Sequence, residues 1–296
     1  MDRPGATFRA APTPAIVRKD PMAPRSLEHG FRVTPGEKVS LKGLDPAEKA
    51  GYDGKDDPEV QARLARDLEA LSELQEKLYA ERQRAVLVVL QALDTAGKDG
   101  VLRHVVGPLD SRGVNVRSFR APSEEELAHD FLWRVHAHAP ARGQMNFWNR
   151  SHYEDVLVAR VEQLVPRAVW EKRYQQINDF ERMLVESGTV VVKLFLHISR
   201  QEQKRRMEER ISDPRKQWKF DPADLRARAR WDEYHEAYED ALTRCSTAWA
   251  PWWVIPADHK WFRNLAVARV LVETLEAIDP RYPAPTGDFS KLVIPD

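Results

Sequence analysis

The stretch that decides the fold is AVLVVLQALDTAGKDG, residues 85 to 100. Its first nine residues are almost all apolar, as a strand of a parallel sheet requires when both of its faces are covered. The chain then runs through the loop ALDTAGKDG into a helix, and this strand–loop–helix context is where phosphate-binding loops occur. Free N–H groups at the start of that helix would hold phosphate oxygens. The stretch therefore predicts a phosphate-binding loop, but one that carries an acid, Asp94, inside it.

The loop departs from the standard spacing G-x-x-x-x-G-K-[ST] at two positions. Ala92 stands in place of the first glycine and Asp99 in place of the Ser or Thr, whose hydroxyl normally coordinates Mg²⁺. Gly97 lets the backbone approach a ligand, and we expect Lys98 to be exposed at the loop and to add a positive charge. Because Mg²⁺ accepts one or two carboxylates together with phosphate oxygens, Asp94 is the candidate metal ligand. The alternative is an ordinary turn in which Asp94 only caps the helix.

A second motif, NFWNRSHYEDVLVARV, begins at the end of the third predicted strand, residues 143–149. In nucleotide kinases of this architecture that position supplies a metal-ordering acid and an arginine. Here Asn149 takes the place of the acid and Arg150 follows, with a planar fork suited to phosphate. Glu154 and Asp155, about one helical turn later, could replace the missing acid. The alternative is a capped helix, with Asn149 or Ser151 as the cap and acids in its first turn.

The most basic part of the chain extends from Ser199 to about Arg230 and lacks strand patterning. We interpret it as a helical flap that closes over phosphates, because such a lid brings cations to the transferred group and excludes water. The alternative is a solvated helix face, since several glutamates partly neutralise the run. Its cations are Arg205, Arg206, Arg210, Arg215, Lys216 and Lys219.

The rest of the chain alternates strands and helices, which predicts an α/β protein with a mostly parallel, five-stranded sheet. We expect an extended N-terminal arm over residues 1–57, a core over 58–280 with the lid at about 199–230, and a tail over 281–296. The further predicted strands are 114–119, 143–149, 189–196 and 252–256. The predicted helices are 58–84, 98–106, 123–138, 151–164, 167–187, 200–211, 222–245 and 259–278.

Composition excludes several classes of protein. Lys and Arg together number 46, as do Asp and Glu, so any basic site is local and we predict no nucleic-acid partner. A single cysteine, Cys245, excludes a disulfide framework and a multi-cysteine zinc site, and fits a reducing cytoplasm. We find no apolar run near the ~20 residues of a membrane span, and no apolar core of the signal-peptide kind. We therefore expect a cytoplasmic protein without a membrane partner.

Taken together, these motifs resemble the polyphosphate kinase 2 family. The resemblance is carried by ALDTAGKDG, APSEEEL, FWNRSHYEDVLVARV, FERML, RISDPRKQWKF, RARWDEY and APWWVIPADHKWFRN, over roughly residues 60 to 280. It implies a P-loop kinase of thymidylate-kinase-like fold, with three α/β/α layers and a helical lid. It also implies phosphoryl transfer between inorganic polyphosphate and nucleotides with Mg²⁺, which Mn²⁺ could replace, and a homo-oligomer, either a dimer or a tetramer. Family members often have Asp in the place of Asn149; this difference, together with QALD and SHYEDVLV, resembles the subgroup that accepts AMP as well as ADP.

The predicted site combines the resemblance with the residues themselves. Its catalytic residues are Asp94, Lys98, Arg150, Glu154 and Arg210, with Asp94 and Glu154 as the metal ligands. Contacts to phosphate or substrate are expected from Ala96, Gly97, Asp99, Gly100, Arg103, Arg120, Asn149, Arg206, Lys216 and Lys219. One alternative function is an ATP-dependent nucleoside monophosphate kinase, which Asp94 and the missing hydroxyl disfavour. Another is a nucleotide-binding module that has lost catalysis, against which the intact charged residues argue.

Overall fold

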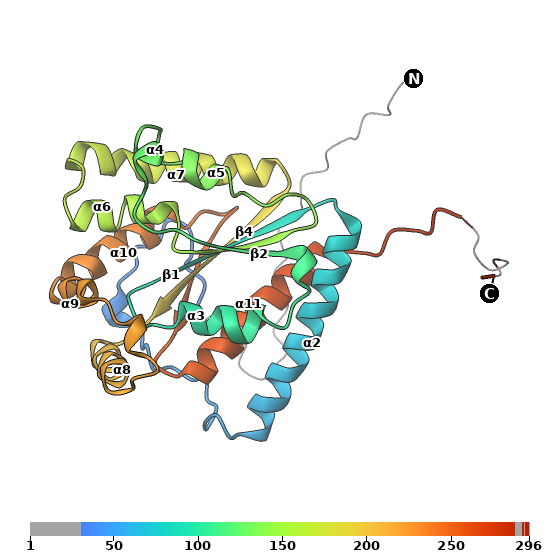
Figure 1. The fold of residues 1–296 in the computed structure, drawn as a ribbon, viewed down its shortest axis with the longest axis horizontal. Coiled ribbons are helices and arrows are strands. Elements are labelled where there is room, and N and C mark those ends of the chain that lie inside the picture. The colour runs from blue at the N-terminus through green and yellow to red at the C-terminus, as the bar shows by residue number, and fades with distance from the viewer. Residues whose placement is uncertain (1–30, 288–291, 293, 296) are drawn as a thin grey trace.

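A parallel sheet forms the centre of the computed structural model, which describes residues 31–287, 292 and 294–295 (Figure 1). The strand order is β2-β3-β1-β4-β5, and every neighbouring pair in it is parallel. β1 lies in the middle, and all of its residues are buried, which explains its apolar sequence. The α/β class and the five-stranded sheet are confirmed. The strands are β1 (Ala85–Ala92), β2 (Val114–Ser118), β3 (Met145–Asn149), β4 (Thr189–His197) and β5 (Trp252–Pro256).

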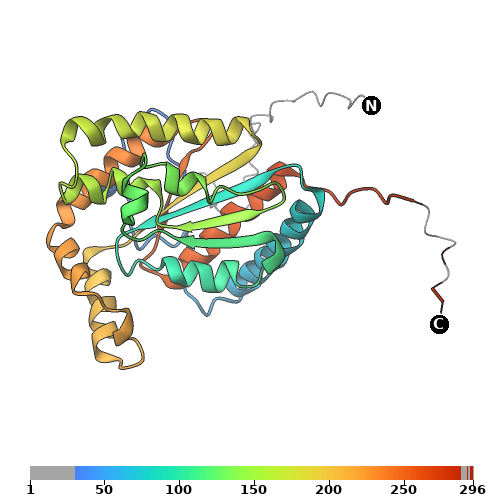
Figure 2. The same cartoon turned by 45° about the horizontal axis from the view of Figure 1, so that its top comes forward.

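Helices cover both faces of the sheet and complete the predicted three layers (Figures 1 and 2). On one face lie α2 (Pro58–Glu81), α11 (Lys260–Ile278) and the short α3 (Lys98–Val101). On the other lie α6 (Val158–Val161), α7 (Arg167–Glu186) and α10 (Trp231–Cys245). α2 begins where the Asp57 side chain accepts a hydrogen bond from the N–H of Glu59, with Pro58 in the first turn. No helix within the described ranges is long and apolar enough to cross a membrane.

Several predicted helices are divided in the structure. Residues 123–138 form two short helices, because the Asp130 side chain accepts hydrogen bonds from the N–H groups of Leu132 and Trp133 and starts a new turn there. The predicted helix over 222–245 is divided at Arg230, and the one over 151–164 begins as a 3₁₀ turn. The elements concerned are α4 (Glu124–Leu127), α5 (Trp133–His136), η2 (Leu102–Val106, a π-helix after α3), η4 (His152–Asp155) and α9 (Pro222–Ala229).

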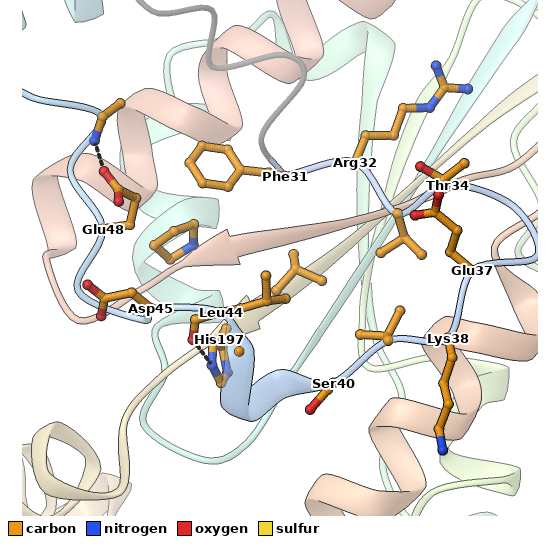
Figure 3. Close-up of a pocket in the computed structure, with 16 residues that line it drawn as sticks. Phe31, Arg32, Thr34, Glu37, Lys38, Ser40, Leu44, Asp45, Glu48 and His197 are labelled. Carbon is orange, nitrogen blue, oxygen red and sulfur yellow. Dashed lines mark hydrogen bonds between the residues drawn. The ribbon is translucent and has the colours of Figure 1, made fainter.

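The described part of the N-terminal arm, residues 31–57, packs on the body beside β5. The N–H of Val33 donates to the Trp252 carbonyl at 2.8 Å, and the N–H of Leu41 donates to Glu239 Oε1 at 2.7 Å. A cavity of about 620 Å³ lies under residues 31–57, which we call the strap (Figure 3). His197, from the end of β4, lines the cavity, and its Nε2 lies 3.1 Å from the Leu44 carbonyl oxygen. The strap thereby covers the β5 edge of the sheet.

The basic segment folds as helix, turn and helix. It consists of α8 (Arg200–Ser212), η5 (Gln217–Lys219) and α9. α8 starts where the Ser199 hydroxyl accepts a hydrogen bond from the N–H of Glu202. In Figure 2 the far end of α8 and the turn after it project from the body, as the predicted lid would.

Candidate active site

The loop between β1 and α3 is bent by two residues with left-handed backbone conformations. Thr95 has φ of 65° and Gly97 has φ of 113°, a conformation that favours glycine at the second position. A Cβ atom on Gly97 would lie 1.8 Å from Nη1 of Arg263, and one on Gly100 would lie 2.6 Å from Nη2 of the same guanidinium. Both glycines therefore allow the loop to lie directly on a buried arginine.

The carbonyl groups of the loop point into the protein. Nε2 of Gln203 donates to the Asp94 carbonyl at 3.1 Å. Nη1 of Arg206 donates to the Thr95 carbonyl at 3.1 Å and to the Ala96 carbonyl at 3.0 Å. Because these interior donors occupy the carbonyl side, the loop presents its N–H groups on its other side.

Those N–H groups form a cradle for an anion. Among the described residues we find no acceptor for the N–H groups of Thr95, Gly97 and Lys98. Successive free N–H groups at a bend before a helix bind phosphate oxygens. The predicted phosphate-binding loop thus has a matching backbone geometry.

Arg206 holds the loop from below and does not face a substrate. Its side chain is buried, with 4% of the residue exposed, and Nε pairs with Glu202 Oε1 at 2.7 Å. Nη2 donates to the carbonyls of Ala257 and Asp258 at 2.7 and 2.8 Å. With the loop carbonyls on Nη1, the guanidinium has no donor group left for phosphate. The prediction that Arg206 contacts phosphate is therefore wrong.

Lys98 lies at the mouth of the loop but is half-buried, not exposed as expected. Its Nζ donates to the Ala92 carbonyl at 2.9 Å. Burial, and then the charge of Arg150, lower the pKa of Lys98 to about 8, against the opposing effect of Asp94. A bound phosphate would strongly stabilise the charged form of this partly desolvated ammonium, because the phosphate carries the opposite charge.

Arg150 joins the two predicted motifs. It directly follows β3 with φ of 63°, so that its side chain turns back toward the loop. Nη2 lies 3.0 Å from Asp94 Oδ1, and Nη1 lies 3.1 Å from Glu154 Oε2. The two carboxylates raise the pKa of Arg150, Glu154 more than Asp94. The predicted catalytic residues Asp94, Arg150 and Glu154 therefore form one cluster in front of the loop.

The neighbouring polar residues point in different directions. Nδ2 of Asn149 donates to Oδ1 of Asp99 at 3.3 Å, which links the end of β3 to the start of α3. Asp155 points away from the cluster and pairs with Arg173 of α7 at 2.8 Å. Burial raises the pKa of Asp155 to about 6. Of the two acids in the second motif, only Glu154 contacts Arg150 in the described structure.

Within the flap, Arg210 pairs with an acid that lies near the loop. Its Nη1 lies 3.6 Å from Oδ2 of Asp224 on α9, and both side chains are largely buried. Burial, followed by the negative charge of Asp94, raises the pKa of Asp224 to about 6. α9 therefore lies within electrostatic reach of the loop, and Arg210 is held on the same side.

The two flap lysines lie further out. Lys216 pairs with Glu209 at 2.7 Å. Nζ of Lys219 lies 5.0 Å from the ring centre of Trp218, a side chain that is 77% exposed. The structure does not bring either lysine to the loop. Arg103, in η2, and Arg120, after β2, are also exposed and pair with no carboxylate in the described ranges.

Arg263 is the site residue that the sequence did not single out. It lies in α11 beneath the loop, 2% exposed, and its Nη1 donates to the Ala96 carbonyl at 3.3 Å. Nη2 donates to Oδ1 of Asn264 at 2.8 Å. The sequence indicates Arg263 only indirectly. Gly97 and Gly100 have no side chains, and this leaves room for a bulky group under the loop.

The acidic residues at the loop suit a metal ion that is shared with phosphate. No group of three or more His, Cys, Asp or Glu side chains in the described residues could hold a metal ion. Asp94 and Glu154 provide two hard oxygen donors, the number that Mg²⁺ takes when phosphate oxygens and water complete its shell. The donor set therefore fits Mg²⁺ bound together with a phosphate chain.

Comparison with known proteins gives concordant matches over most of the chain. The family model for polyphosphate kinase 2 (PPK2) matches residues 54–283. AMP/ADP-polyphosphate phosphotransferase of Meiothermus ruber is 50% identical over 264 residues, which cover 89% of this chain and 98% of that protein. ADP-polyphosphate phosphotransferase of Rhodopseudomonas palustris is 42% identical, over 86% of this chain and 92% of the relative. The crystal structure of polyphosphate kinase 2 from Arthrobacter aurescens TC1 has a TM-score of 0.85 at 44% identity, covering 90% of this chain and 95% of that one.

Proposed function

The chain belongs to the polyphosphate kinase 2 family, and we propose that it transfers a phosphoryl group from inorganic polyphosphate to AMP and to ADP. AMP becomes ADP, ADP becomes ATP, and polyphosphate loses one phosphate unit at each step. The observation that carries the proposal is the cluster of Arg150 with Asp94 and Glu154 in front of the anion cradle. It supplies both the cation and the carboxylates that a phosphate chain with a metal ion requires.

The loop and Lys98 hold the reacting phosphates. Phosphoryl transfer asks little covalent chemistry of the protein, so that positioning and charge stabilisation account for most of the catalysis. The free N–H groups of the cradle fix phosphate oxygens, and Lys98 adds a charge at its mouth. The acceptor phosphate of AMP or ADP is already ionised, so that a strong general base is not needed.

Asp94 and Glu154 are the residues that would hold Mg²⁺. The ion would neutralise phosphate charge next to two carboxylates that would otherwise repel the substrate. Arg150 keeps these carboxylates together until substrate arrives, and its fork then binds a phosphate. Neutral Asn149 is compatible with this arrangement because Glu154 supplies the second carboxylate.

Arg210 is the flap residue with the strongest case for contacting phosphate. It pairs with Asp224 of α9, whereas Lys216 and Lys219 belong to the turn between α8 and α9. Closure of the flap would carry Arg210 from Asp224 to the phosphate chain and exclude water from the site.

The test is incubation of purified protein with AMP, polyphosphate and Mg²⁺ in the absence of ATP, with nucleotides separated by chromatography. We expect ADP first and ATP later. An ATP-dependent monophosphate kinase would give neither product under these conditions, and only ADP when ATP is supplied. That second pattern would replace our proposal.

A further inference from the structure

A fully buried ionic cluster lies directly behind the site. It joins Lys193 of β4, Glu181 of α7 and Tyr153 of η4, and Nε2 of His152, also in η4, lies 3.2 Å from Glu181 Oε1. Nζ of Lys193 lies 2.5 Å from Glu181 Oε2 and 2.9 Å from the Tyr153 hydroxyl, which itself donates to Glu181 Oε1 at 2.9 Å. The Lys193 and Glu181 side chains are 0% exposed, and the third acceptor for Lys193 is the Cys245 carbonyl at 2.6 Å.

Stability alone does not require this cluster. Removing two opposite charges from water costs several kcal/mol per ion, and apolar side chains of similar volume often stabilise a core as well or better. What the ion pair adds is a fixed geometry, because its hydrogen bonds hold each side chain of the cluster in one position. The partner with a connection to the phosphate site is Tyr153, since the next residue in the chain is Glu154.

A second tie fixes the start of the same turn. Nε2 of Gln91, buried in β1, donates to the Ser151 hydroxyl at 3.0 Å. The hydroxyl oxygen of Ser151 also accepts the N–H of Tyr153 at 3.2 Å. Arg150, in its left-handed conformation, directly precedes Ser151, and Glu154 directly follows Tyr153.

We propose that Tyr153, held by Lys193 and Glu181, is a positioning residue that places Arg150 and Glu154 for phosphoryl transfer. This inference rests on the proposed function. The turn between β3 and α6 is short, so that a shift of the Tyr153 ring moves Glu154 and loosens its contact with Arg150 at 3.1 Å. A displacement of about 1 Å in a catalytic group can lower the rate by about 10²-fold.

The test compares Tyr153→Phe with wild-type protein and with Tyr174→Phe. Tyr174 is also buried and lies on α7, but its hydroxyl accepts a hydrogen bond from Arg160 of α6 at 3.4 Å and none from Lys193 in the described structure. We expect Tyr153→Phe to lower kcat with AMP and polyphosphate about tenfold, with KM for AMP changed less than about threefold. Tyr174→Phe should keep wild-type kcat, and thermal unfolding of both variants should remain cooperative.

A triple variant separates positioning from stability. Lys193→Met, Glu181→Leu and Tyr153→Phe together remove the buried ion pair, but they also take Glu181 from Nε2 of His152 and Lys193 from the Cys245 carbonyl. The melting temperature should therefore fall, because buried polar groups are left without partners, and kcat is measured well below it, per mole of folded protein. We expect kcat to fall at least as far as in Tyr153→Phe.

The outcomes distinguish this inference from the function on which it rests. Wild-type protein that forms no ADP from AMP and polyphosphate would overturn both. If the wild type is active, and Tyr153→Phe and the triple variant keep its kcat or lose kcat only in proportion to the fraction of unfolded protein, the positioning role alone is refuted. The positioning role is also refuted if neither Tyr153→Phe nor the triple variant folds, because the cluster is then required for folding.

Discussion

Replacement of Lys98 by Met tests the loop most sharply, because the structure separates its effect on catalysis from its effect on folding. In the described structure the ammonium donates one interior hydrogen bond, to the Ala92 carbonyl at 2.9 Å, and a hydrogen bond from a charged donor contributes about 1.5–3 kcal/mol to stability. Methionine loses this hydrogen bond but avoids the opposing cost of desolvating a charge in this half-buried position. The variant should therefore unfold within about 1 kcal/mol of the wild type.

The effect on catalysis should be much larger. A unit charge about 4 Å from a phosphate oxygen contributes roughly 4 kcal/mol at the effective dielectric of a protein surface. Loss of one preorganised group that stabilises charge in the transition state costs about 3–4 kcal/mol, or 10²–10³-fold in kcat. We expect a loss of this size with both AMP and ADP.

The pH dependence supplies a second readout. With a pKa of about 8, Lys98 is charged at neutral pH and loses its proton as the pH rises. The kcat/KM for polyphosphate should therefore fall above about pH 8 in the wild type, since this ratio reports the free enzyme. Between about 8 and 10.5 the unfolded chain binds more protons at this lysine than the folded one, so that Lys98 contributes a rise in stability with pH there. Lys98→Met should lack both effects.

The assay is steady-state formation of ADP from AMP at saturating Mg²⁺, beside urea unfolding of the same preparations. Lys172→Met is the matched control, because Lys172 is exposed on α7 and remote from the loop. Near-normal kcat in a folded Lys98→Met variant would refute the assignment of the loop.

Five further variants probe the rest of the site. Glu154→Gln should lower kcat about 10²-fold, at least as strongly with AMP as with ADP. Asp155→Asn should keep most activity, because Asp155 faces α7; steady-state kinetics of both variants would show the reverse order if the turn were rotated. Arg210→Ala should weaken kcat/KM for polyphosphate about tenfold, and Lys216→Ala about twofold, as titrations of polyphosphate would measure. Gly97→Ala should lower the free energy of unfolding by about 2 kcal/mol, since the φ of Gly97 is 113°. An unchanged urea unfolding curve would show that the loop backbone adjusts to the new side chain.

The central strands β1 and β4 could be predicted from sequence because parallel strands with both faces covered are long apolar runs. AVLVVLQA, for example, is buried at every position. The divided helix over 123–138 could not be predicted in the same way. Its break depends on the Asp130 side chain, which accepts hydrogen bonds from two N–H groups and starts a new turn. A helical pattern does not show whether such an acid caps a turn or faces solvent.

Some residues of the site could likewise be predicted from sequence, and others could not. Asp94, Arg150 and Glu154 lie within reach of one another because the carboxyl ends of β1 and β3 meet at one edge of the sheet. The cluster of cations in the flap predicts a phosphate contact for Arg206, but the body covers the face of α8 that carries Arg206 and leaves Arg205 exposed. Local sequence does not reveal which face of a polar helix is covered. Arg263 was missed for a related reason, since its partner is a backbone carbonyl far away in the chain.

The central claim is that polyphosphate is the phosphoryl donor for AMP and then for ADP. The most direct test uses uniformly ³³P-labelled polyphosphate with unlabelled AMP and Mg²⁺, without ATP, and follows the label into separated nucleotides over time. We predict labelled ADP with one label per molecule, followed by ATP with two, and no accumulation of either with Lys98→Met. Nucleotides that remain unlabelled while the polyphosphate stays intact would contradict the account.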